Sequence, residues 1–464
     1  MITYDLAGRG KLPRYEYLYR RLRQDILTGK LAAGERLPSK RAMAEHLGVS
    51  VITVDTAYSQ LVAEGCVTAQ ARRGYFVTER AMSPAVPAAE ERTAGVPGER
   101  SWKLDLRSNR VDPALFPSAA WAKLTRRVLS EGAGILSSGS PHPGLYSLRE
   151  AIAAHLRGYK GMDVSPEQVV VGSGAEFLYL MAAQFFAGAA FALEDPGYPK
   201  IRLAYTHSGA KCLPVPLDTE GVDPESLRRS GAAVLHISPA HQYPTGLVTP
   251  LPRRQELLRW ARETGGYIIE DDYDSELSFT PRPLPTLYSI DRAGRVIYMN
   301  TFSQTISPGL RAGYLVLPER LTALWNERLG FYSCSVPTLE QEVLERFISS
   351  GGYERHLSRL RKKCRERRAA VLAAFEDSAL AGRVRTADAG AGMHFLLEVD
   401  TGLSDGELRR RAETFGVRLG FLSDYAFDPA HAREHVLVIN CGALYGEALD
   451  TAVELLVRIL NGSG

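Results

Sequence analysis

This 464-residue sequence has no closely spaced pair of cysteines, no apolar stretch long enough to cross a membrane, and little net charge. The five cysteines are scattered, with no Cys-x-x-Cys pair and no histidine cluster beside them, which argues against a disulfide framework and a metal site. No apolar run reaches the length that spans a bilayer, and Met1–Leu6 contains no basic region leading into an apolar segment. We therefore expect a cytoplasmic protein with no bound metal and no membrane partner.

The net charge of +3 is unevenly distributed along the chain. Residues 1–80 hold 13 Lys and Arg against 8 Asp and Glu, whereas the other 384 residues carry a small negative excess. A cationic N-terminal module is typical of a protein that contacts phosphates. The length predicts two or three domains, and a content of 45% hydrophobic and 23% charged residues is typical of globular chains.

The first eighty residues predict three short helices. Residues 15–28 place leucine and isoleucine at helical spacing, Lys40–Leu47 forms a second periodic segment, and residues 51–61 form a third that Ser50 is placed to cap. Two short helices joined by a turn that contains Gly48 form a helix-turn-helix.

A hairpin is predicted after the helices. Residues 66–78 alternate between apolar and polar types, with Arg72, Arg73 and Gly74 at the tip, so the module is winged. The outer side of the third helix carries short side chains suited to base edges and thymine methyls, namely Ile52, Thr53, Thr56 and Ser59. These features favour a DNA-binding module over the alternative, a small packing domain without a ligand.

This module resembles the GntR family of winged-helix repressors, through the motifs Gly34–Ser39 and Leu47–Ser50 and the wing glycine. The resemblance implies that residues 1–79 bind double-stranded DNA. The contacts that it implies are Ser39, Arg41, Ser50, Thr53, Tyr58, Arg72 and Arg73. Val51 stands where the family often has arginine, and Asp55 would repel DNA, so we expect fewer charge-assisted contacts than usual.

Residues 80–103 are rich in proline, alanine and charge, which predicts a flexible linker. From residue 104 to 464, short apolar strands alternate with helical stretches, which is typical of an α/β domain with a mostly parallel sheet, followed by a smaller part of strands and helices. The strands that we expect are Gln168–Val171, Ala190–Glu194, Lys211–Val215, Ala233–Ser238, Tyr267–Asp271, Val296–Asn300 and Gly313–Leu317.

Four of these strands are followed by residues suited to one ligand. Small residues in Gly172–Glu176 leave backbone N–H groups free for a phosphate at a helix N-terminus. Tyr198 can stack on a flat heterocycle, and Glu270–Tyr273 supplies a carboxylate and a phenol. The segment Thr301–Tyr314 adds a hydroxyl and an arginine for an anion. Because ligands of such folds gather at the carboxyl ends of the strands, we expect one shared site.

Thr301–Tyr314 resembles the pyridoxal phosphate (PLP) loop of fold-type I aminotransferases, in which a lysine forms a Schiff base with the cofactor. Gln304 stands at that lysine position, and a carboxamide is not a nucleophile, so we assign no catalytic residue. The resemblance implies that Asp271 pairs with the pyridine nitrogen and Tyr273 with the ring hydroxyl. The cofactor-binding residues that it implies are Gly174, Ala175, Glu176, Tyr198, Tyr243, Asp271, Tyr273, Ser303, Gln304 and Arg311.

Two further departures concern the substrate. Tyr243 stands where working aminotransferases have an asparagine before the proline, and Val438 aligns with the arginine that grips a substrate carboxylate. A winged helix, a linker and an aminotransferase-like domain in this order resemble the MocR/GabR-type transcription regulators. That family implies a homodimer whose second domain senses a small-molecule effector without turnover.

Several alternatives stay open at this point. One is a PLP-dependent aminotransferase with an accessory DNA-binding domain. Another is a sensor that holds PLP noncovalently, or that prefers a PLP–amino acid adduct or pyridoxamine phosphate, none of which needs a lysine. A third is an unrelated ligand, or no ligand.

Overall fold

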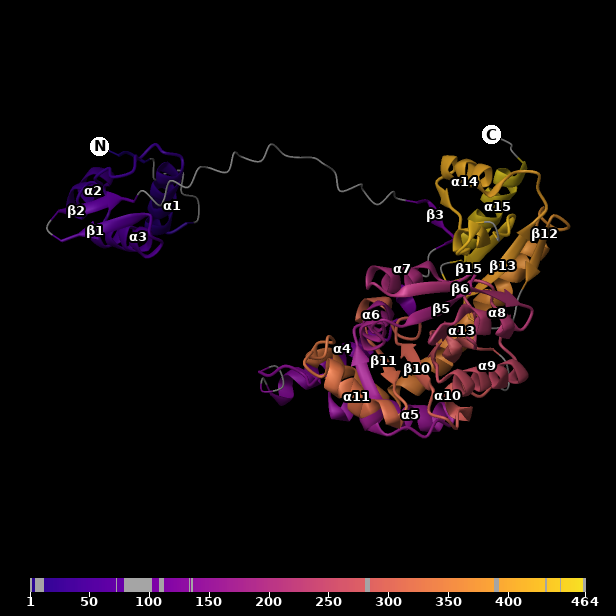
Figure 1. The fold of residues 1–464 in the computed structure, drawn as a ribbon. Coiled ribbons are helices and arrows are strands. Elements are labelled where there is room, and N and C mark those ends of the chain that lie inside the picture. The colour runs from indigo at the N-terminus through magenta and orange to yellow at the C-terminus, as the bar shows by residue number, and fades with distance from the viewer. Residues whose placement is uncertain are drawn as a thin grey trace. The chain divides into compact units, whose positions relative to one another are not determined.

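A computed structural model describes most of the chain as two units, Met1–Arg100 and Ser101–Gly464 (Figure 1). The described residues are 2–4, 12–71, 73–78, 102–107, 112–132, 134, 137–279, 284–387, 392–429, 432–442 and 444–461. The predicted linker, residues 80–103, lies outside them except for its last two positions. Among the described helices, none combines the length and the apolar composition that crossing a membrane requires.

The N-terminal unit contains the three predicted helices, α1 (Arg14–Leu27), α2 (Lys40–Leu47) and α3 (Val51–Ala63). The capping predicted at α3 is present, since the Ser50 side chain accepts a hydrogen bond from the backbone of Thr53. Gly48 ends α2 in the left-handed conformation, at φ 63°, which glycine adopts without strain. The helix-turn-helix geometry therefore follows from local sequence.

A two-stranded antiparallel hairpin, β1 (Val67–Gln70) and β2 (Gly74–Val77), completes this unit as the wing. One apolar cluster joins the hairpin to all three helices, and it includes Leu22, Met43 and Val77. Burial of this cluster fixes which face of α3 remains exposed.

The large unit is built on an eight-stranded sheet with the order β4-β11-β10-β9-β8-β5-β6-β7. The run from β6 through β5, β8 and β9 to β10 is parallel, whereas β11 is antiparallel to both of its neighbours and β7 is antiparallel to β6. The strands are β4 (Val169–Gly172), β5 (Ala190–Asp195), β6 (Lys211–Asp218), β7 (Gly221–Val222), β8 (Val234–Ile237), β9 (Tyr267–Asp271), β10 (Val296–Thr301) and β11 (Gly313–Val316). All seven predicted strands are present, and their ends differ from the predictions by three residues at most.

Helices surround this sheet (Figure 1). They are α4 (Ser118–Glu131), α5 (Tyr146–Lys160), α6 (Ala175–Phe185), α7 (Pro199–His207), α8 (Pro224–Ser230), α9 (Leu251–Thr264), α10 (Leu287–Ile290), α11 (Glu319–Leu329) and α12 (Thr338–Ser349). Because helices cover both faces, central strands such as β4 and β8 are buried along their whole length and are continuously apolar.

The long helix α13 (Gly352–Glu376) leads into a smaller α+β part, as predicted. This part contains an antiparallel sheet of β12 (Val384–Ala387), β13 (His394–Val399) and β15 (Val436–Asn440), with helices α14 (Asp405–Thr414) and α15 (Glu447–Asn461). The short strand β3 (Leu104–Asp105) pairs with β14 (Val417–Arg418), so the start of this unit lies beside its C-terminal elements (Figure 1).

Candidate functional site

A cavity of about 200 Å³ lies at the carboxyl ends of the sheet strands. Nine of the ten predicted cofactor-binding residues line it, namely Ala175, Glu176, Tyr198, Tyr243, Asp271, Tyr273, Ser303, Gln304 and Arg311. The tenth, Gly174, lies directly beside it, because a Cβ built there would stand 3.1 Å from the Arg311 guanidinium carbon. The structure thus brings together residues that are up to 137 positions apart in sequence.

One end of the cavity is suited to an anion. Gly174 has φ +83° and precedes α6, whose first backbone N–H groups are not used by the helix itself. Arg311 donates from Nη2 to Glu176 Oε2 at 2.8 Å, and Lys200 Nζ lies 2.7 Å from Glu176 Oε1. The Lys200 ammonium, followed by Arg311, lowers the pKa of the Glu176 carboxyl. Glu176 therefore neutralises part of the positive charge that an incoming phosphate would meet.

The other end of the cavity is buried and holds Asp271, the last residue of β9. Its Oδ2 accepts a hydrogen bond from the Tyr179 hydroxyl at 2.8 Å and lies 3.4 Å from His236 Nε2. His236 is in turn bonded to the Tyr205 hydroxyl at 2.7 Å. The other carboxylate oxygen, Asp271 Oδ1, is buried without a hydrogen-bond partner. A buried acceptor left open in this way is suited to the protonated nitrogen of a pyridine ring.

Aromatic side chains form the wall between these ends. The rings of Tyr198 and Tyr243 meet edge to face, with centroids 5.5 Å apart, and the Tyr243 hydroxyl lies 3.0 Å from that of Tyr425. Burial raises the pKa of Tyr243 and of Tyr273 well above the usual tyrosine value, so both phenols are neutral donors. Such a wall can hold a flat heterocycle by stacking and by hydrogen bonds from hydroxyl groups.

Two of the three departures noted in the sequence, Gln304 and Val438, have defined surroundings in the structure. Gln304 lines the cavity just beyond β10, where its carboxamide can hydrogen-bond but cannot form an imine. Val438 is buried in an apolar cluster with Tyr243, Leu396 and Tyr425. The cluster behind Tyr243 of the cavity wall is consequently apolar.

Four residues of this site were not predicted from the sequence: Lys200, Tyr179, His236 and Tyr205. Lys200 and Tyr179 line the cavity, and the other two support Asp271 from behind. Lys200 lies two residues after Tyr198, so its position next to a predicted lining residue could have indicated that it lines the cavity. The other three lie within a helix or a strand interior and had no motif to mark them.

The candidate DNA interface lies on the N-terminal unit. Ser39, Arg41, Ser50 and Arg73 are exposed and Thr53 is partly exposed, while Arg72 lies outside the described residues. Ile52, on the same outer side of α3, is 77% exposed. Asp55, the carboxylate that seemed out of place, forms an ion pair with Lys40 of α2, which reduces its repulsion of phosphates.

Tyr58 is a correction to the predicted contact set. Its side chain is fully buried, its hydroxyl donates to the Pro38 carbonyl at 3.0 Å, and its ring packs against Tyr75. Burial of an aromatic ring in the small core outweighs exposure on the helix face, so Tyr58 anchors α3 and does not point toward a ligand.

Comparison with known protein families finds two matches along the chain. Residues 14–77 match the family "Bacterial regulatory proteins, gntR family", and residues 102–410 match "Aminotransferase class I and II".

Similar proteins share both parts. The HTH-type transcriptional regulator TauR of Rhodobacter capsulatus is 31% identical over 99% of this chain and 99% of its own length. The probable rhizopine catabolism regulatory protein MocR of Rhizobium meliloti is 32% identical over 90% of this chain and 88% of its own. Among solved structures, LysN, an α-aminoadipate aminotransferase of Thermus thermophilus complexed with N-(5'-phosphopyridoxyl)-L-leucine, matches 77% of this chain and 92% of its own, with TM-score 0.69 and 30% identity.

Proposed function

Because the chain belongs to the GntR family of bacterial regulatory proteins, and to those HTH-type transcriptional regulators that carry an aminotransferase class I and II domain, we propose that its cavity senses a phosphorylated pyridine compound. In this proposal ligand occupancy of the large unit alters how two winged helices of a homodimer bind an operator. The ligand is PLP, pyridoxamine phosphate or a PLP–amino acid adduct, and it is bound without turnover.

One observation carries the proposal. The cavity retains a buried, open acceptor at Asp271 and a cation at Arg311, yet has Gln304 where covalent capture would need an amine. The first two features favour a phosphorylated pyridine. The third favours reversible binding, which is what a sensor needs in order to follow the ligand concentration.

In this proposal each group has a separate task. PLP supplies an electron-withdrawing ring and an aldehyde when bound, and the protein residues hold them. Asp271 accepts from the ring nitrogen, Tyr198 stacks on the ring, and Tyr273 donates to the ring hydroxyl. Arg311, Ser303 and the start of α6 bind the phosphate, after Glu176 has released Arg311.

Lys200 is the residue on which the alternative of a PLP enzyme depends. It lines the cavity, but hydrogen bonding to Glu176 raises the pKa of its ammonium, so at neutral pH it is protonated and is not a nucleophile. We therefore expect no covalent link between PLP and this lysine.

A titration tests the proposal directly. PLP is added to the full chain and the visible spectrum is recorded. Borohydride is then added to reduce any imine, and the tryptic peptides are analysed by mass spectrometry. We expect saturable binding with no pyridoxyl group on any peptide, whereas a Gln304→Lys variant acquires one at position 304. A reduced pyridoxyl group on Lys200 of the parent would favour the enzyme alternative, and absence of saturable binding would reject PLP as the ligand.

The DNA-binding part is tested separately. Footprinting on the chain's own promoter region should show two half-sites if a dimer binds. An Arg41→Ala variant should weaken binding and lower the slope of log affinity against log salt by about 1, because one phosphate contact is lost. Arg20→Ala, on the exposed side of α1, is the matched control and should bind as the parent does.

A further inference from the structure

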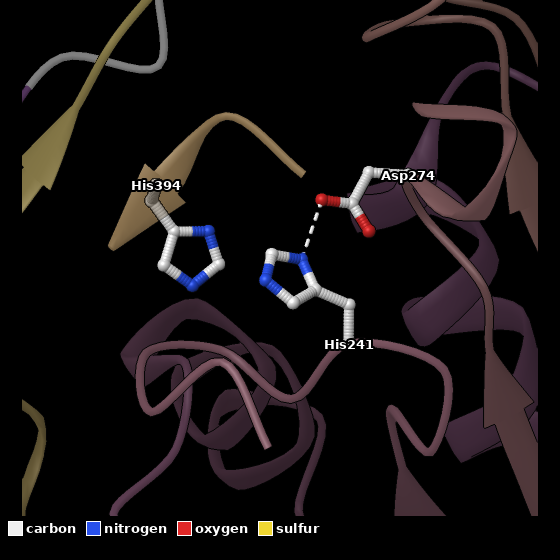
Figure 2. A group of neighbouring side chains, drawn as sticks. All are labelled: His241, Asp274 and His394. Atoms are coloured by element: carbon white, nitrogen blue, oxygen red, sulfur yellow. Dashed lines mark hydrogen bonds and ion pairs between the residues drawn. The ribbon is translucent and has the colours of Figure 1, made fainter. Parts of the chain in front are cut away.

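Three polar side chains from separate segments meet behind the ligand cavity. Figure 2 shows His241, from the loop after β8, between Asp274, which follows β9, and His394, the first residue of β13. Each of the three residues is at least 96% buried. Their ligand atoms all lie within 4.8 Å of one another. Among the described residues, these three side chains lie close enough together to hold a metal ion.

The hydrogen bonds within this group are incomplete. His241 Nδ1 lies 2.8 Å from Asp274 Oδ2 and 3.3 Å from the Tyr273 hydroxyl. His394 Nε2 is buried and has no hydrogen-bond partner, although its ring lies against that of His241 with centroids 4.3 Å apart. A buried ring nitrogen is normally paired, so His394 Nε2 is available as a ligand to an ion.

The spacing suits a tetrahedral ion. Bonds of about 2.0–2.2 Å from zinc to nitrogen and oxygen place neighbouring ligand atoms about 3.3–3.5 Å apart. The observed separations are 2.8 Å for His241 and Asp274 and 3.3 Å for His241 and Tyr273, and the His394 ligand atom lies within 4.8 Å of those of His241 and Asp274, so side-chain shifts would be needed to bring all of them to this spacing. Tyr273 can thus supply the fourth ligand.

Gly392 packs directly against this group. A Cβ at this position would stand 2.2 Å from His241 Cε1 and 2.4 Å from both His241 Nδ1 and Asp274 Oδ2, so a side chain here would displace both residues. The residue has φ +63°, so backbone conformation and lack of space both favour glycine here.

We propose that His241, Asp274 and His394 bind one divalent cation of the zinc type, with the Tyr273 hydroxyl completing the coordination. The ion would link β13 of the smaller part to the loops that follow β8 and β9 of the large sheet. Because Tyr273 also lines the ligand cavity, metal and effector binding would be coupled. The metal site is independent of the proposed function, whereas the coupling rests on it.

Cobalt is the probe for the site. Co²⁺ is titrated into the chelator-treated full chain, and we expect one equivalent to produce the intense visible bands of a tetrahedral complex, which Zn²⁺ then removes. His394→Gln and Asp274→Asn should each weaken binding by about 100-fold or more, since even partners outside the coordination shell are worth ~10–100-fold. His142→Gln is the matched control, because His142 is also buried with an unpartnered ring nitrogen, and it should bind like the parent.

The parent titration keeps the proposal falsifiable if a variant fails to fold. Absence of a saturable one-to-one cobalt complex in the parent overturns the metal site, as does equal binding by parent and folded His394→Gln. For the coupling, PLP affinity is measured with and without zinc, and we expect weaker PLP binding in the zinc form. Equal affinities would show that metal and PLP binding are not coupled and that Tyr273 is not a metal ligand. The cobalt titration would still test the other three ligands, and the PLP titration would still test the proposed function.

Discussion

Two glutamates near the ligand cavity differ in their surroundings. Glu194, which lies near Asp271 but does not line the cavity, has its pKa raised to about 8 by burial, whereas the pKa of Glu176, at the anion end, is lowered by Lys200 and Arg311. Arg311 and Glu176 are about half exposed, while Asp271 is 3% exposed. The ring end is thus pre-organised by burial, and the anion end is held by charges that water and salt can screen.

The largest expected effect concerns the ring end. Asp271→Asn retains an acceptor for the Tyr179 hydroxyl but removes the negative charge that a protonated pyridine nitrogen needs. A buried charge-assisted hydrogen bond is worth roughly 3 kcal/mol, so PLP should bind about 100-fold more weakly. Equilibrium titration by absorbance measures this. Asp195→Asn, a buried carboxylate at the end of β5 that does not line the cavity, should bind PLP like the parent.

A smaller loss is expected at the anion end. Arg311→Ala should weaken PLP binding by about 10-fold, because a half-exposed ion pair is screened by solvent. The loss should shrink further as salt is raised from low to high concentration. If the Arg311 variant lost more affinity than the Asp271 variant at every salt concentration, the contrast between the two ends would be reversed.

Removing the counter-ion should strengthen binding. Glu176→Gln leaves Lys200 and Arg311 free to meet a phosphate, so affinity for PLP should rise several-fold, about the effect of one exposed charge. Pyridoxal, which has no phosphate, is the matched ligand control and should show no gain. A loss of PLP affinity in this variant would mean that Glu176 positions Arg311 instead of competing for it.

A separate prediction concerns the dependence of stability on pH. The pKa of Glu194 is about 8 in the folded protein and about 4.5 when unfolded, so its neutral form stabilises the fold below pH 4.5 and this stabilisation is lost as pH rises toward 8. Within that window the parent should lose up to about 1.4 kcal/mol per pH unit from this group, and Glu194→Gln should remove that slope.

Urea unfolding at pH 6, 7 and 8 measures this slope. All four tryptophans lie beyond residue 100, so their fluorescence reports on the large unit alone. Glu176→Gln is the control and should keep the parent's slope, because its lowered pKa lies outside the window. Equal slopes in the parent and Glu194→Gln would place Glu194 in a more hydrated setting than its burial indicates.

Much of the architecture could be predicted because it depends on local patterns. Continuous apolar segments identified the buried strands, and serine and glycine marked the ends of α2 and α3. The cavity residues could be predicted because strand ends in a parallel sheet converge, so four motifs were sufficient to place eight lining residues, and the segment before Pro244 added Tyr243.

Other features depended on which side of an element faces the core. Helical spacing grouped Tyr58 with the apolar residues of the third helix, and only the GntR resemblance implied a DNA contact; packing against Tyr75 and Pro38 holds the side chain inward. His241 and His394 are 153 positions apart, and neither is part of a metal-binding motif. A cluster of this kind has no periodicity or spacing to reveal it.

The sequence by itself determined the two-part organisation, the order of helices and strands, and the presence of a carboxamide at Gln304, because each depends on residue identity or on neighbours a few positions away. Only the tertiary structure decided that Asp271 keeps an open oxygen, that Glu176 pairs with Arg311, and that two histidines meet at Asp274. The physical reason is that burial and Coulomb interactions act through space, between residues that the chain alone keeps far apart.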